Sequence, residues 1–193
     1  MDNIRGSAFM VLAMAAFSLE DVFVKSASAS LPVGEILMLF GFGGTLVFML
    51  LTKRRNEAII HPAILSRPVL LRAASEVVGR MFFAMALAVA PLSSVSAILQ
   101  ATPLVVVMGA AILFGEQVGW RRWTAIVVGF VGVLLIIRPG TEGFESTSLL
   151  AVVAMLGLAG RDLATRAAPP VLSNMQLGIY GFFVLIPVGF CMM

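Results

Sequence analysis

Two long apolar runs in the stretch from 91 to 140 decide which class of fold this chain can adopt. The runs cover 93–114 and 123–137, and a short polar segment with Glu116, Arg121 and Arg122 joins them. A helix rises about 1.5 Å per residue, so the longer run crosses a hydrocarbon core roughly 30 Å thick. Both runs are therefore predicted to be membrane-spanning helices.

The rest of the chain is also too apolar for a soluble domain. Hydrophobic residues make up 60% of the sequence, charged residues make up 12%, and the mean hydropathy is +1.05. Soluble domains contain roughly 45–50% apolar and about 25% charged residues. We therefore expect a lipid bilayer to surround much of the protein.

The charged and metal-binding residues limit the partners. The net charge of +3 is small and spread along the chain, whereas nucleic-acid binders gather Lys and Arg on one face, so we expect no nucleic-acid partner. One cysteine, Cys191, and one histidine, His61, exclude an internal disulfide framework and a histidine-rich metal cluster. We expect neither a metal nor a cofactor.

The apolar runs and the prolines and glycines between them predict an all-α integral membrane protein, a multi-helix bundle. Most of the prolines and glycines lie in the breaks, although Pro103 and Pro187 lie inside runs. The chain is expected to contain six full helices and a partial seventh, at 4–25, 33–52, 69–90, 93–114, 123–137, 148–168 and 176–193.

Lysines and arginines predict the orientation in the membrane, because short cytoplasmic loops are enriched in them. They gather between the second and third predicted helices, at Lys53, Arg54 and Arg55, and between the fourth and fifth, at Arg121 and Arg122. The N-terminus is therefore predicted to be cytoplasmic. The loop 138–148, which contains two glutamates, is predicted to be external.

Five helices separate those two ends, so a second copy of the unit must enter the membrane upside down. An ungapped overlay of 11–42 on 152–183 pairs identical residues at seven positions, Asp21 with Asp162 among them, and places Lys25 on Arg166. We predict a first repeat at 1–140 and the start of a second, inverted repeat at 141–193. The second repeat stops inside its second helix, which indicates either missing residues or a natural truncation.

A series of short motifs between residues 86 and 140 resembles the EamA domain of the drug/metabolite transporter superfamily. The motifs are Ala86-Leu87, Ala90-Pro91-Leu92, Thr102-Pro103, Gly115-Glu116, Arg121-Arg122-Trp123, Gly129, Gly132 and Arg138-Pro139-Gly140. The resemblance implies ten helices in two inverted five-helix repeats, in the inner (plasma) membrane of a bacterium. It also implies secondary transport of a small metabolite by alternating access, not an enzyme activity.

The resemblance extends weakly to the substrate. The opening segments 10–25 and 31–37 are similar to uptake carriers for S-adenosylmethionine or riboflavin, and an amino acid is a further candidate. Many family members carry an arginine in the second helix, whereas the matching segment 35–42 has none.

Charged residues inside predicted spans are the first candidates for a substrate site, because each costs about 2.5–3.5 kcal/mol to insert. Glu76 and Arg80 lie four residues apart, which suits either a cavity role or a self-neutralised pair on one helix. Arg80 is the first choice for contacting an anionic or carboxylate group.

Two charged doublets, Glu20-Asp21 and Arg161-Asp162, occupy equivalent positions in the repeat overlay. Neighbouring residues point about 100° apart on a helix, so one member of each doublet faces inward. The overlay favours Asp21 and Asp162. Their depth in the membrane, and that of Glu76, also motivates a proton-coupling hypothesis.

Three polar residues inside predicted spans complete the set of substrate-binding candidates: Gln100 and Thr102 beside a kink at Pro103, and Tyr180, the only tyrosine, as part of a cavity lining. The Thr102-Pro103 kink either lines a substrate path or serves packing. Glu116 is expected to form a solvated ion cluster with Arg121 and Arg122. The small residues at 125, 129 and 132 predict a helix-packing or homodimer surface.

Three functions remain to be weighed. A secondary transporter agrees with the resemblance, and the chain carries no ATP-binding motif that would indicate a pump. The alternative is a non-transporting membrane subunit or scaffold formed by a truncated transporter. A membrane-embedded enzyme is disfavoured because the HExxH, Cys/His zinc and GxSxG patterns are absent.

Overall fold

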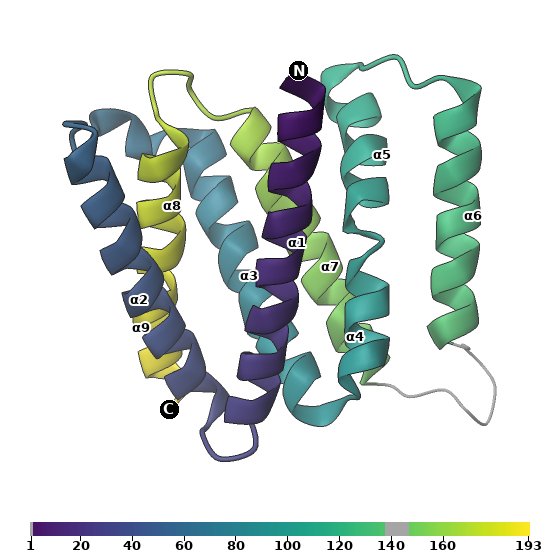
Figure 1. Ribbon diagram of the computed structural model, residues 1–193, viewed down its shortest axis with the longest axis horizontal. Helices are drawn as coiled ribbons and strands as arrows, with labels where there is room; N and C mark the ends of the chain where they lie inside the picture. Colours follow the sequence, from purple (N-terminus) through teal and green to yellow (C-terminus); the bar gives the residue numbers. More distant parts are fainter. Residues whose placement is uncertain (1, 138–146) are drawn as a thin grey trace.

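The computed structural model describes residues 2–137 and 147–193, and these residues form a bundle of helices (Figure 1). The predicted external loop and the predicted repeat boundary at 140 lie outside the described residues. The described helices are α1 (Asp2–Ala27), α2 (Val33–Arg54), the short 3₁₀ helix η1 (Pro62–Leu65), α3 (Arg67–Val89), α4 (Leu92–Leu99), α5 (Thr102–Phe114), α6 (Trp120–Ile137), α7 (Ser148–Arg166), α8 (Asn174–Phe183) and α9 (Leu185–Cys191).

The all-helical prediction is confirmed, but two predicted helices are each split in two. The run 93–114 forms α4 and α5, and the run 176–193 forms α8 and α9. Pro103 and Pro187 lie in the first turns of α5 and α9, where a proline needs no N–H partner. The two prolines that fall inside the predicted runs therefore start new helices.

At the break between α4 and α5, a side-chain hydroxyl bonds to a backbone carbonyl that the helix leaves without a donor. In an unbroken helix the carbonyl of Leu99 would accept a hydrogen bond from the backbone nitrogen of residue 103, which is a proline without N–H. The Thr102 hydroxyl instead donates to that carbonyl, with Oγ1 2.5 Å from the oxygen. Thr102 thus satisfies the polar group that Pro103 leaves open.

Helices α3 and α7 form the central pair, and their backbones approach closely at two glycines. A Cβ atom added to Gly157 of α7 would lie 2.5 Å from the backbone nitrogen of Gly79 of α3. Helix α2 meets α9 in the same way, since a Cβ on Gly34 would lie 2.6 Å from the carbonyl oxygen of Gly189. At both places the glycines let two helix backbones approach closely.

Figure 1 shows how the remaining helices are placed around this pair. Helices α8 and α9 lie against α2 on one side, while α4, α5 and α6 lie on the other, with α6 at the outer edge. The N-terminus and the α2–α3, α5–α6 and α7–α8 connections all lie at one end of the bundle. The predicted basic loops therefore share one end, as a single membrane orientation requires; which end faces the cytoplasm stays a prediction.

Apolar side chains cover both the interior and the outside of the bundle. The main core joins α3, α4, α5 and α7 around buried residues such as Leu87, Ile98 and Met155. Large apolar side chains also point outward, for example Phe9 on α1 and Val128 on α6. Outward apolar surface is expected where lipid replaces water.

Four described segments are long and apolar enough to cross a membrane: Val33–Arg54, Leu92–Phe114, Ser148–Arg166 and Asn174–Cys191. Spanning by α1, α3 and α6 remains a prediction. The arginines and the glutamate of α3 lower its apolar character, yet Glu76 and Arg80 are buried inside the bundle. Their charges are thus shielded from lipid by neighbouring helices.

The small-residue face of α6 lies partly against its own neighbour. Gly129 accommodates the side chain of Leu104 from α5, whereas a Cβ on Gly132 would meet nothing within 4 Å. The packing role predicted for this face is therefore visible at Gly129, and a homodimer contact stays a prediction.

Candidate functional site

A cluster of charged side chains crosses the interior of the bundle and joins three helices. We call it the charged cluster and define it by Glu20 of α1, Arg72, Glu76 and Arg80 of α3, and Arg161 and Asp162 of α7. Glu76 is 4% exposed and Arg80 is 8% exposed. Buried charges at this depth require partners, and the cluster supplies them.

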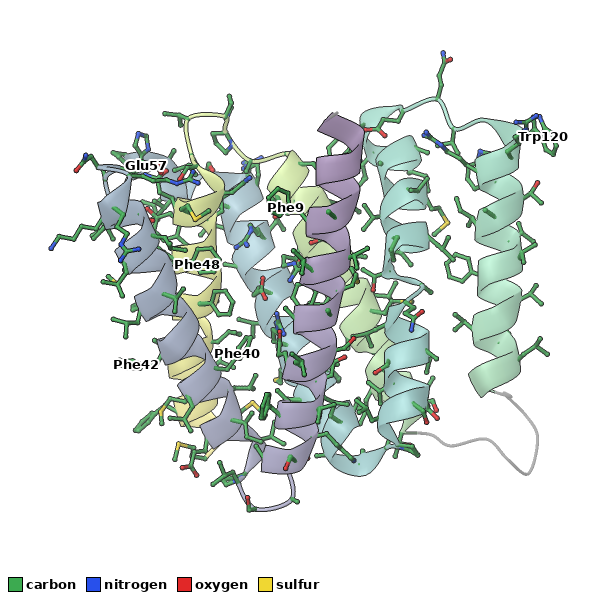
Figure 2. All side chains as sticks on the ribbon, viewed as in Figure 1. Phe9, Phe40, Phe42, Phe48, Glu57 and Trp120 are labelled. Carbon is green, nitrogen blue, oxygen red and sulfur yellow. The ribbon has the colours of Figure 1, made fainter. Side chains whose placement is uncertain are left out.

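Arg80 is held from three directions. Its Nη1 forms an ion pair with Glu20 of α1, and its Nε donates to Oε1 of Glu76, one turn earlier on α3, at 3.3 Å. The ring of Phe40 on α2 lies 4.7 Å from the guanidinium carbon, a cation–π distance. Figure 2 shows Phe40 on the inner side of α2 and Phe42 on its outer side.

Glu76 is surrounded by more than one cation. Besides Arg80, Nη1 of Arg161 lies 3.6 Å from Oε1, and Nη2 of Arg72 lies 3.9 Å from Oε2. Arg72 also donates from Nε to the hydroxyl of Thr165 on α7, at 2.9 Å. The carboxylate of Glu76 therefore keeps neutralising partners if any single arginine is removed.

The doublets contact α3 through members that the repeat overlay did not favour. Glu20 and Arg161 reach Arg80 and Glu76, respectively, whereas the overlay favoured Asp21 and Asp162. Asp162 pairs with its neighbour Arg161, at 2.7 Å from Nη2, and its side chain is 42% exposed. The two equivalent positions thus meet α3 with opposite charges, an acid from α1 and a base from α7.

Four participants in this site were missed or underrated by sequence reasoning. From the sequence, Glu20 and Arg161 are predicted only as doublet members whose neighbours are favoured to face inward, and no site role is predicted for Arg72. The spacing Arg72, Glu76, Arg80 places all three on one face of α3 and was a usable signal. Phe40 has no sequence signal that separates it from other phenylalanines.

A small hollow opens beside the charged cluster. Its volume is about 10 Å³, which is room for about one water molecule. Glu20 and Arg80 supply the polar side chains of its wall, and the remaining lining is apolar: Val24, Ile36, Leu37, Phe40, Phe83 and Ala84. The hollow is therefore too small for an organic ligand as it stands, and it marks a place where the helices would have to separate to admit one.

The polar candidates outside the cluster have other partners. Gln100 is exposed at the end of α4, and Thr102 bridges the α4–α5 break as described above. The Tyr180 hydroxyl donates to the Ile59 carbonyl at 2.9 Å and accepts from the His61 backbone N–H at 3.1 Å. No ion pair or hydrogen bond among the described residues links these three to the charged cluster, and their substrate contacts stay predictions.

A lysine at the end of α1 forms hydrogen bonds with the end of α3. Lys25, in the last turn of α1, donates from Nζ to the carbonyls of Leu87 and Ala90 of α3, at 2.5 Å and 3.0 Å. The Leu87 carbonyl lacks its usual helical donor because residue 91 is a proline. Lys25 therefore satisfies this carbonyl and joins the end of α1 to the end of α3.

At the other end of the bundle, Glu116 has a different partner from the one expected. It pairs with Arg166 of α7, whose Nη2 lies 2.5 Å from Oε1, instead of forming the predicted cluster with Arg121 and Arg122. Arg121 lies over the ring of Trp120 at 5.7 Å. Since Glu116 and Arg166 are both well exposed, this pair contributes little to stability.

Metal binding is not indicated by the described part of the chain. Among residues 2–137 and 147–193, no three His, Cys, Asp or Glu side chains are grouped so that they could hold a metal ion. The acids of the site are matched by arginines, and so the cluster is arranged to neutralise charge within the bundle.

Together, the apolar exterior and the charged interior define a multi-pass helical membrane protein with a polar site enclosed between helices. The chain belongs to the EamA-like transporter family, whose sequence profile matches residues 4–138. The resemblance found in the sequence is thereby confirmed.

Several curated relatives match most of the chain. It is 27% identical over 186 residues to a riboflavin transporter of Rhizobium johnstonii, which covers 95% of this chain and 61% of the relative. It is 30% identical over 167 residues to the pseudopaline exporter CntI of Pseudomonas aeruginosa, and this match covers 83% of the chain and 56% of the exporter. It is 24% identical over 165 residues to an S-adenosylmethionine uptake transporter of Rickettsia prowazekii, and this match covers 84% of the chain and 55% of the transporter.

The chain thus spans a little over half the length of these relatives. Their names indicate transporters, not enzymes, and they include both uptake and export proteins. No solved structure gives a significant match to the chain.

Proposed function

We propose that this protein acts in secondary transport, moving a small organic metabolite across the inner membrane of a bacterium by alternating access. The observation that carries the proposal is Arg80, a buried arginine that contacts α1, α2 and α3 and faces a hollow. An arginine buried between helices, beside a hollow that can widen when the helices separate, is suited to holding a polar group during its passage. The predicted orientation places the N-terminus in the cytoplasm.

The relatives narrow the substrates that deserve testing. Riboflavin and S-adenosylmethionine come from the names of relatives, and amino acids come from the resemblance to the wider superfamily. One of the relatives is an exporter and another is an uptake transporter, so experiment must determine the direction of transport. We therefore propose one of these three substrate classes.

Proton coupling is a finer proposal. Asp21, Glu76 and Asp162 are acids on helices of the charged cluster, so one of them is proposed to exchange a proton during transport. The test measures uptake into vesicles with and without an imposed pH gradient. Uptake that stays the same in both conditions would remove this proposal without touching the transport function.

Transport itself is tested in cells that express the gene encoding this chain. Uptake and export of radiolabelled riboflavin, S-adenosylmethionine and amino acids are measured for wild type, Arg80→Ala and the control Arg121→Ala. We expect saturable transport that falls at least tenfold in Arg80→Ala and remains in the control, since Arg121 is exposed. Absence of transport of every compound by correctly inserted protein would favour a non-transporting subunit or scaffold.

A further inference from the structure

We propose that Glu20 is a built-in occupant of an anion site on Arg80, and that a carboxylate-bearing substrate replaces it. The carboxylate of Glu20 would then stand where the carboxylate of the substrate binds. This inference rests on the proposed function, because it assigns a substrate class to the same site. Of the three candidates named above, S-adenosylmethionine and amino acids carry a carboxylate, whereas riboflavin does not.

Of the two acids that contact Arg80, Glu20 has fewer other partners than Glu76. Glu76 has Arg161 and Arg72 as further partners, whereas the ion pairs of the described residues give Glu20 Arg80 alone. The side chain of Glu20 is 19% exposed and that of Glu76 is 6% exposed. Glu20 is therefore the acid that exchanges with an external carboxylate.

The guanidinium of Arg80 offers its donors in two directions. Its Nε is bound to Glu76, on its own helix, while Nη1 is bound to Glu20. Glu20 and Arg80 both line the hollow. When Glu20 moves away, the outer edge of the guanidinium faces the hollow with donors in the fork geometry that matches a carboxylate.

The surroundings of Arg80 limit what the rest of the substrate can be. Apart from the ion pair, the wall of the hollow is apolar, and the Phe40 ring lies against the guanidinium. The hollow has room for only about one water, so a ligand that brings a carboxylate to Arg80 must part these helices, and its remaining portion then lies beside Phe40 and Phe83. The substrate class is a carboxylate with an apolar or aromatic body.

Replacement of Glu20 would also change how α1 is held. The contacts between side chains of α1 and α3 include two ties, the Glu20–Arg80 ion pair and the bonds from Lys25 to the end of α3. Most other α1 side chains that the structure describes are exposed. Substrate binding would thus release one of the two ties, which links occupancy of the site to movement of α1.

The test uses purified, membrane-reconstituted protein and two probes of equal size, 3-phenylpropionate and 3-phenylpropionamide, with binding measured by calorimetry. If Glu20 occupies the site in more than about nine of ten molecules, its removal strengthens apparent affinity about tenfold or more. We expect Glu20→Gln to bind the acid at least tenfold more tightly than wild type. Binding of the amide should stay unchanged.

Three further variants complete the test. Arg80→Ala should abolish binding of the acid, and Glu116→Gln, which removes an exposed acid elsewhere, should bind like wild type. Glu20→Asp keeps the charge but shortens the side chain, so its affinity for the acid should lie between those of wild type and Glu20→Gln. This variant keeps the test valid if Glu20→Gln fails to fold.

Two results would overturn the inference. One is equal affinity of Glu20→Gln and wild type for the acid, including no detectable binding by either. The other is equal affinity for the acid and the amide. Either result leaves the proposed transport function standing if the cell assay shows saturable transport, so the two failures can be told apart.

Discussion

The approach of α3 and α7 at Gly79 and Gly157 makes a strong prediction about packing. A Cβ on Gly157 would lie 2.5 Å from the Gly79 nitrogen and 2.7 Å from its Cα. Ordinary contacts between such atoms are about 3.5–4.0 Å, so Gly157→Ala must separate the two backbones by roughly 1 Å. Overpacking of this kind costs about 1–3 kcal/mol.

The displacement also reaches the charged cluster. Gly157 lies one turn before Arg161 on α7, and Gly79 lies one turn after Glu76 on α3. The Arg161–Glu76 pair, now at 3.6 Å, would therefore lengthen. A loss of transport in Gly157→Ala is expected even though residue 157 contributes no polar group.

The assay is thermal unfolding in detergent, with Gly132→Ala as the matched control. A Cβ on Gly132 meets nothing within 4 Å, so the control reports only the helix-propensity change, which favours Ala by about 1 kcal/mol. A difference of 2 kcal/mol between the two variants lowers Tm by about 4–8 °C in a chain of this size. Equal Tm values for Gly157→Ala and Gly132→Ala would refute the close-approach argument.

Two further predictions concern tethers at the ends of the bundle. Lys25→Met removes the donor from the Leu87 carbonyl and should lower the free energy of unfolding by about 1.5–3 kcal/mol. The control Lys53→Met, at an exposed site, should change it by less than about 0.5 kcal/mol. Equal unfolding curves for the two variants would contradict the proposed tie between α1 and α3. Tyr180→Phe removes the hydroxyl that binds the Ile59 carbonyl and should cost about 1 kcal/mol. Amide exchange in 56–61 should then become faster, and unchanged exchange would argue against this anchor.

The helical architecture could be predicted from the sequence because it depends on local properties. Apolar runs of membrane length and prolines at their ends predicted the helices of the described region to within a few residues at most ends. The presence of Pro103 and Pro187 inside two runs signalled an irregularity. The choice between a kink and a full break depended on how neighbouring helices pack, which the sequence does not contain.

The candidate site was predictable only in part. Glu76 and Arg80 lie on one helix, so their spacing sufficed to pair them. The inward members of the doublets depend on the rotation of α1 and α7 about their axes, which tertiary packing sets. The partner of Glu116 likewise lies on a helix 50 residues away in the sequence, and no local pattern could identify it.

The central claim is that the hollow beside Arg80 is a water-accessible substrate site and not a packing defect. It is tested most directly by placing a thiol in its wall, with Ala84→Cys in a Cys191→Ser background, because Ala84 lines the hollow and is buried. The account predicts that a small water-soluble maleimide labels this thiol in membranes, and that a transported substrate slows the labelling. Labelling by lipid-soluble reagents alone, with no protection by any transported substrate, would contradict it.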